Sequence, residues 1–253
     1  MSSQNTPPGE LIANDKNRSQ LQSIIQLSIS AIDPSSSPVR ISATSPKLPV
    51  TISARQIWSA RPHEPLTVST RHTPLDIPIT GRKGTGGSMR RHLTFSEPGM
   101  TPSFGAFIPH YKQPSERDWQ ETLGFATIPP AISKKSYDVV KEIDFAEVVA
   151  DRGLLKVGVE FEFGLRGEPL RQTPGIEWWN WGDLEGELKG KVLGYVTDPR
   201  LNGWDREEER RKLPGDFVLP FGCWEDSEDD DGNEMVWLEV VVDERRIRVE
   251  VVE

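Results

Sequence analysis

Three tryptophans within four residues form the least ordinary chemical feature of the sequence: Trp178, Trp179 and Trp181, with Asn180 among them. Exposed indole rings stack on sugar rings, on proline-rich peptides or on methylated cations. Buried indole rings instead remove about 150–250 Å² each from water. Because few other large apolar residues surround the cluster, the sequence favours burial, with a partner-binding aromatic patch as the alternative.

The order of the three rings predicts which of them faces outward. In an extended backbone, adjacent side chains point to opposite faces, so Trp179 and Trp181 share one face and Trp178 lies on the other. The residues alternating with Trp178 are Ile176 and Asn180, and the series ends on a polar side chain. We therefore expect Trp179 and Trp181 to pack on the body of the protein and Trp178 to be the more accessible.

A second candidate site is a basic stretch among glycines, formed by Arg82, Lys83, Arg90 and Arg91. A phosphate-binding loop of the Walker type requires Gly-Lys-Ser/Thr at its end, whereas Gly87 and Ser88 follow Gly86 here. The main interpretation is a flexible solvated loop. A phosphate-contacting or nuclear-import segment is the alternative.

We expect no metal site, cofactor or catalytic residue, because the sequence contains no complete signature of any of them. Residues 227–238 match a calcium loop in part, but Ser227 and Leu238 stand where that loop requires carboxylates. The four histidines (His63, His72, His92 and His110) lack metal-ligand spacing. A single cysteine, Cys223, excludes an intrachain disulfide and any multi-cysteine cluster.

The elements that must position these residues are mainly strands. Valine, isoleucine and threonine total 49 residues against 10 alanines, a bias toward pleated, half-buried surfaces. Short apolar segments with period-two alternation and turn signals between them predict an antiparallel sandwich with one or two short helices. We expect strands at 21–30, 39–43, 50–52, 66–68, 75–77, 92–95, 137–143, 155–163, 191–196, 217–221, 234–242 and 245–252, the last two joined by a tight hairpin.

Within these strands the alternation assigns faces. Val157, Val159, Phe161 and Phe163 alternate with charged residues or glycine and are expected to face the core. Residues 144–151 are expected to form one or two helical turns. A short solvent-facing helix is expected over 204–213, where Asp205 is a suitable N-cap.

The domain organisation predicted is a disordered tail over residues 1–18, followed by one β-sandwich domain over 19–253. Two irregular insertions are expected in that domain, near residues 80–118 and 171–233. The prolines of the first insertion are incompatible with a regular ladder, and the second insertion contains the tryptophan cluster.

Several segments resemble the strands of immunoglobulin-like sandwiches. Residues 128–130, 136–140, 143–145 and 153–159 resemble the later strands, and 65–70 with 73–76 are similar to an early strand and its turn in small immunoglobulin-like proteins of filamentous fungi. The resemblance covers roughly residues 21–165 and implies only the sandwich architecture, because the chain lacks the paired cysteines of antibody domains. Such folds carry many unrelated activities.

The charge and composition of the chain indicate which classes of partner it can bind. The formal net charge is −9, divided into +4 over residues 1–124 and −13 over 125–253, so the acidic half repels nucleic acid. We expect no nucleic-acid or membrane partner and an intracellular protein, cytoplasmic or nuclear. The function predicted is a non-catalytic binding or scaffold protein whose aromatic patch or sheet edge receives a protein or peptide. The alternative is an enzyme of unfamiliar type with its site among the loops.

Overall fold

The computed structural model describes residues 21–33, 37–71, 73–76, 93–96, 124–149, 153, 155–166, 176, 178–194, 215–218, 220–221 and 236–253. The protein is mainly β, as the composition predicted, with several antiparallel and mixed sheets. Helical structure in these ranges consists of a 3-10 turn, η2 (Ala131–Ser133), and one short helix, α3 (Phe145–Val148). None of the described helices is long and apolar enough to cross a membrane.

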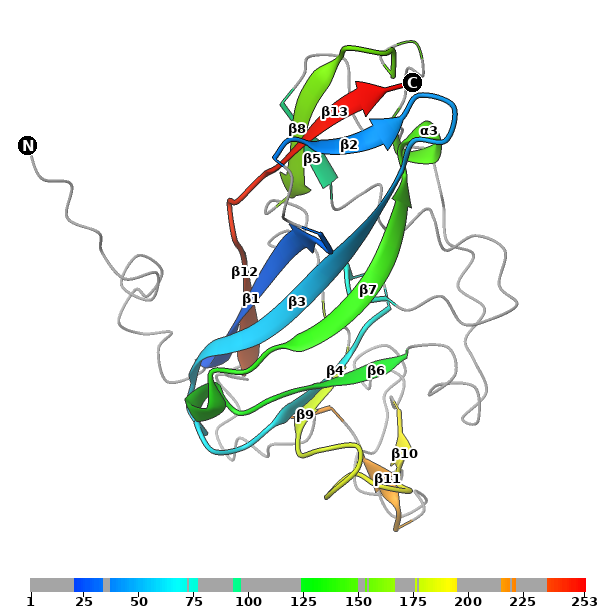
Figure 1. Ribbon diagram of the computed structural model, residues 1–253. Helices are drawn as coiled ribbons and strands as arrows, with labels where there is room; N and C mark the ends of the chain where they lie inside the picture. Colours follow the sequence, from blue (N-terminus) through cyan, green and yellow to red (C-terminus); the bar gives the residue numbers. More distant parts are fainter. Residues whose placement is uncertain are drawn as a thin grey trace, which may run out of the picture.

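The first sheet has the order β12-β1-β3-β7 (Figure 1). Its strands are β12 (Trp237–Val242), β1 (Leu21–Ala31), β3 (Lys47–Ser59) and β7 (Tyr137–Asp144). β3 pairs antiparallel with β1 on one side and with β7 on the other, while β12 runs parallel to β1. The predicted strand at 50–52 is thus the middle of a much longer strand.

The second sheet has the order β2-β13-β8-β5. It contains β2 (Val39–Ser42), β13 (Ile247–Val252), β8 (Glu160–Leu165) and β5 (Leu93–Phe95). β13 is parallel to β2 and antiparallel to β8.

The predicted hairpin between the last two strands is wrong, because β12 and β13 belong to different sheets. At the end of β12 the amide of Asp243 donates to the carbonyl oxygen of Leu27 in β1 at 2.8 Å. The chain then leaves the first sheet and enters the second, just as β1 and β2 do near the start of the chain (Figure 1). Two consecutive strands at each end of the chain therefore run side by side across both sheets.

The third sheet and a small pair of strands lie at the lower end of the view in Figure 1. The third sheet is antiparallel with the order β6-β4-β9, from β6 (Phe125–Ile128), β4 (Leu66–Ser69) and β9 (Trp179–Trp181). The small parallel pair is β10 (Val192–Leu193) with β11 (Phe217–Val218). The predicted insertion at 171–233 thus contains three short strands in its described part.

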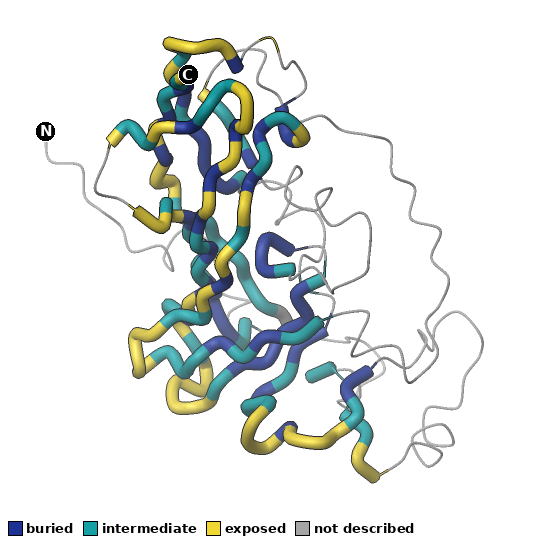
Figure 2. Tube along the Cα trace, turned by 45° about the vertical axis from the view of Figure 1, so that its right-hand side comes forward, coloured by how far each residue is buried: buried dark blue, intermediate teal, exposed yellow. Residues whose placement is uncertain are grey.

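One contiguous apolar core joins the three larger sheets, and buried segments run through the interior while turns are exposed (Figure 2). Its aromatic centre is Phe95, Phe145, Phe161 and Phe163; the ring centroids of Phe95 and Phe145 lie 5.1–6.4 Å from each other and from those of Phe161 and Phe163. Asp144 caps α3 by accepting from the amide of Ala146 at 2.9 Å, which confirms the helical turn expected there.

The face assignment at β8 is half right. Phe161 and Phe163 are buried and Val159 is partly buried, but Val157 is 56% exposed. The strand begins only at Glu160. Before it, the amide of Val159 donates to the carbonyl oxygen of Lys156, and Gly158 has a φ of +86°. This turn interrupts the alternation, because a period of two holds only while the backbone stays extended.

Residues 73–76 form a turn and not the beginning of a strand. The hydroxyl of Thr73 donates to the carbonyl oxygen of Thr70 at 2.6 Å, and the amide of Asp76 donates to that of Thr73 at 3.1 Å. Leu75 is buried all the same. The tail at 1–18, the helix expected at 204–213 and all but residues 93–96 of the 80–118 insertion lie outside the described residues.

Candidate functional site

Trp178 is fully buried, which overturns the expectation that it is the most accessible of the three tryptophans. Its ring meets that of Phe125 edge-on with centroids 5.0 Å apart, and it packs with Leu188 and Leu193 in a small core of its own. Its Nε1 donates to the carbonyl oxygen of Gly194 at 3.2 Å. The segment 182–194 thus folds back over this face. Alternation predicts which face a residue lies on but not what covers that face.

Trp179 and Trp181 share the opposite face, as the alternation predicted, and both belong to the main core. Their rings are perpendicular with centroids 6.2 Å apart, and Phe221 packs against both. The guanidinium of Arg61 lies 5.5 Å from the centre of the Trp181 ring and 5.1 Å from that of Phe221. Arg61 also pairs with Glu64 at 3.3 Å, so the turn between β3 and β4 is held against this aromatic pair.

The three tryptophans therefore form a structural cluster, and their rings offer a partner almost no exposed surface. β9 pairs with β4, and the amide of Ser69 donates to the carbonyl oxygen of Trp178 at 2.7 Å. The Nε1 of Trp181 is buried without a hydrogen-bond partner among the described residues. An unpaired buried donor of this kind costs about 1–3 kcal/mol.

A candidate binding surface is the open edge of β7, which pairs with β3 on one side only within the described sheet. Immediately after β7, the amide of Phe145 donates to the carbonyl oxygen of Pro46 at 2.8 Å, so this position faces β3. Neighbouring residues of a strand turn their backbone groups to opposite sides. Ile143, Lys141 and Val139 therefore also face β3.

The backbone groups of Asp138, Val140 and Glu142 point instead toward the open edge. Val140 is 65% exposed, the largest exposed fraction of any large apolar side chain described. Glu142 pairs with Lys47 of β3 at 2.8 Å, and Asp138 is exposed. The backbone N–H and C=O groups of these three residues are therefore available to pair with another strand. Their side chains are an apolar residue between two carboxylates.

The sequence hypothesis named a sheet edge without locating it. The sequence feature that could have indicated this edge is the series Asp138, Val140 and Glu142. On this exposed face of the strand, Val140 is an apolar residue between two acidic ones. Period two identified the strand, but only the sheet order shows which strand is at an edge.

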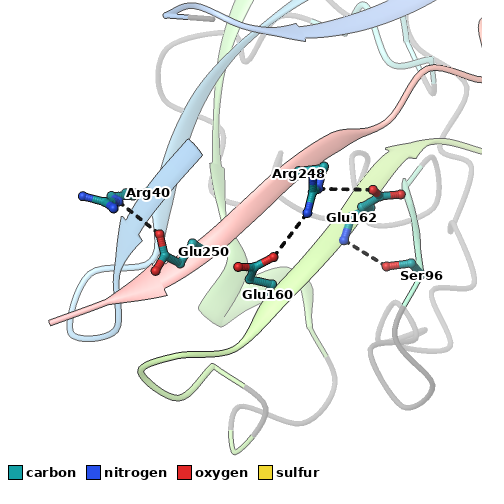
Figure 3. Close-up of polar contacts among 6 residues, drawn as sticks. All are labelled: Arg40, Ser96, Glu160, Glu162, Arg248 and Glu250. Atoms are coloured by element: carbon teal, nitrogen blue, oxygen red, sulfur yellow. Dashed lines mark hydrogen bonds and ion pairs between the residues drawn. The ribbon is translucent and has the colours of Figure 1, made fainter. Parts of the chain in front are cut away.

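The outward face of the second sheet carries a row of paired charges (Figure 3). Arg40 pairs with Glu250 at 3.0 Å, and Arg248 lies 3.4 Å from Glu160 and 3.6 Å from Glu162. All are at least partly exposed, and exposed pairs contribute about 0–1 kcal/mol each. These two arginines and three glutamates sum to a formal charge of −1, so this face provides no strong field for a charged ligand.

Lys141 is the titratable group with the largest shift described. Its side chain lies on the same face of β7 as the buried Val139 and Ile143, and its ammonium donates to the carbonyl oxygen of Asp76. Burial lowers the pKa of Lys141 to about 8, although the carboxylate of Asp76 opposes the shift. Within the described part of the chain no cluster of three His, Cys, Asp or Glu side chains could hold a metal ion.

The remaining sequence-based candidates lie mostly outside the described residues. They are Arg82, Lys83, Arg90 and Arg91 of the basic stretch, His72, His92 and His110, Cys223, and residues 227–235 of the partial calcium loop. Of the four histidines only His63, which is exposed, is described, and of residues 227–238 only 236–238 are described, with Leu238 in β12.

Comparisons with known proteins found no matching family model, no matching curated protein and no matching solved structure.

Proposed function

We propose that this protein is a non-catalytic binding or scaffold protein that receives an extended segment of a protein partner on the open edge of β7. The observation that carries the proposal is the 65% exposure of Val140 at the centre of that edge. An extended peptide that adds to a sheet gains main-chain hydrogen bonds, and the alternating side chains give selectivity.

The chemistry of the edge suggests the partner's sequence. Residues directly opposite each other in a pair of strands have their Cβ atoms about 4.5–5.5 Å apart, and opposite charges there stabilise the pair. A partner strand would therefore carry an apolar residue opposite Val140. Basic residues would stand opposite Asp138 and Glu142.

The same proposal includes an immunoglobulin-like sandwich as the scaffold. A shared core between the first and second sheets supports it, and so do the strands that the chain contributes to both sheets at each end. The parallel pairs β1 with β12 and β2 with β13 make these sheets mixed.

The test is a selection of peptides from a displayed library on the full chain, followed by titration of the selected peptides on variants. Val140→Pro removes the amide that faces the open edge and leaves the ladder to β3 intact. We expect it to weaken peptide binding at least about tenfold while the protein stays folded. Val140→Thr keeps the amide and should bind within a factor of about three.

Hydrogen exchange of the backbone amides shows which strand the peptide binds. The amides of Asp138, Val140 and Glu142 should slow when the peptide binds. Equal binding by Val140→Pro and wild type, or protection confined to another strand, would refute the proposal.

A further inference from the structure

One end of the first sheet presents two exposed apolar side chains, one near the end of a strand and one in a 3-10 turn. Trp58, near the end of β3, is 43% exposed, and Ile132 in η2 is 60% exposed. The amide of Ile132 donates to the carbonyl oxygen of Pro62 at 3.1 Å, which ties η2 to the β3–β4 turn. In Figure 1, η2 lies where β1 begins and β3 ends.

Basic residues are near these two apolar residues in the sequence. Residues 53–65 and 129–138 contain Arg55, Arg61, Lys134 and Lys135 against two acidic residues, Glu64 and Asp138, a formal net charge of +2. Glu64 pairs with Arg61. Arg55, Lys134 and Lys135 are exposed; Arg55 donates to the side-chain oxygen of Gln26 at 3.1 Å and is close enough to Asp243 to interact with its carboxylate.

The register of the sheet brings the two segments together. Tyr137 pairs with Ala54, so the residues that precede β7 pass beside the last residues of β3. η2 contacts β3 directly. Arg55, Trp58, Ile132, Lys134 and Lys135 thus lie at one end of the molecule, although about 75 residues of sequence separate the two groups. We call these five residues the basic tip.

We propose that the basic tip docks on the surface of an anionic lipid bilayer, contrary to the sequence-based expectation of no membrane partner. Trp58 lies near the end of a strand and Ile132 in a 3-10 turn, and both side chains are exposed, so they are placed to enter a headgroup layer. Tryptophan favours the membrane interface, and basic residues near the surface are attracted to anionic lipids. The overall charge of −9 does not prevent this, since salt screens charges beyond about 10 Å.

The test measures sedimentation of the full chain with vesicles of phosphatidylcholine alone and of phosphatidylcholine mixed with phosphatidylserine. We expect binding only to the mixed vesicles, weakened by salt. Lys134→Glu with Lys135→Glu should weaken it more than about tenfold, since each basic residue near the surface contributes about fivefold. Ile132→Ser, at an exposed position, should weaken it without loss of fold.

One variant separates docking from folding. Lys134 has a φ of +56°, a conformation that glycine adopts without strain. Lys134→Gly should therefore keep or raise the melting temperature while lowering affinity for the mixed vesicles about fivefold.

The matched control is Lys156→Glu with Val157→Ser, an exposed basic and apolar pair beside β13 on the second sheet. This control and Val140→Pro should bind vesicles as wild type does, so the result is independent of the β7 edge. The proposal fails if wild type does not prefer the mixed vesicles, or if the control loses binding equally. It also fails if soluble polyglutamate binds the tip and Ile132→Ser has no effect, which would indicate an acidic protein partner.

Discussion

The amide of Ile32 donates to the carbonyl oxygen of Pro49 at 3.4 Å, on the side of β3 that faces β1. Pro49 pairs with Glu142 across the other side of the strand. Its backbone therefore turns away from β7, so the missing amide hydrogen of Pro49 removes no hydrogen bond from the ladder between β3 and β7. This places the backbone of Glu142 on the open edge, in agreement with the contact between Phe145 and Pro46.

Amide exchange along β7 should consequently alternate. We expect the amides of Asp138, Val140 and Glu142 to exchange at least about tenfold faster than those of Val139 and Lys141, because only the latter are in the ladder to β3. Residue-resolved hydrogen exchange by NMR measures this. Uniform protection along β7 would mean that another segment already covers the edge.

Phe161→Ala should destabilise the protein by about 3–5 kcal/mol, the range for emptying a buried aromatic site. Phe161 is buried and its ring lies 5.3 Å from that of Phe145. Val157→Ala, three positions before β8, should cost less than about 0.5 kcal/mol because Val157 is exposed. Denaturant melts of both variants check the difference, and similar losses would contradict the turn at Gly158.

The two faces of the tryptophan cluster should respond differently to phenylalanine. Trp178→Phe loses the hydrogen bond to Gly194 and leaves that carbonyl group buried, with an expected cost of about 1–3 kcal/mol beyond the lost packing. Trp181→Phe removes a buried donor that has no described partner, so its net cost should be smaller. The midpoints of urea unfolding test the order, and a larger loss at Trp181 would reverse it.

Stability should rise with pH as Lys141 loses its proton. Its pKa is about 8 in the folded protein and 10.5 in the unfolded chain, so the unfolded state binds more protons between these values. The free energy of unfolding should gain up to about 3 kcal/mol across this window. Burial raises the pKa of Tyr137, which opposes the gain at the alkaline end.

Lys141→Met isolates this contribution, because Tyr137 is present in both proteins. At about pH 7 the wild-type protein pays the free-energy cost of burying a protonated Lys141, and the variant does not. This cost is largest at pH values below the pKa of Lys141 in the folded protein. The stability difference between variant and wild type should shift in favour of wild type as pH rises toward 10.5. Urea melts across this range measure it. A difference that is constant with pH would show that Lys141 titrates normally.

The sequence by itself determined where many strands lie and which residues they bury. In β7 and β13 the alternation of apolar and charged residues fixed the faces, because an extended backbone places successive side chains on opposite sides. The same local rule placed Trp179 and Trp181 together. Each of these properties depends only on neighbours in the chain.

Tertiary structure decided which strands pair and what covers each face. β12 and β13 follow each other closely yet join different sheets, and segment 182–194 buries Trp178. The open edge of β7 and the basic tip likewise exist only because distant segments meet. Pairing and burial are decided by the free energy of the whole core, so a local pattern that fits several partners equally well cannot select among them.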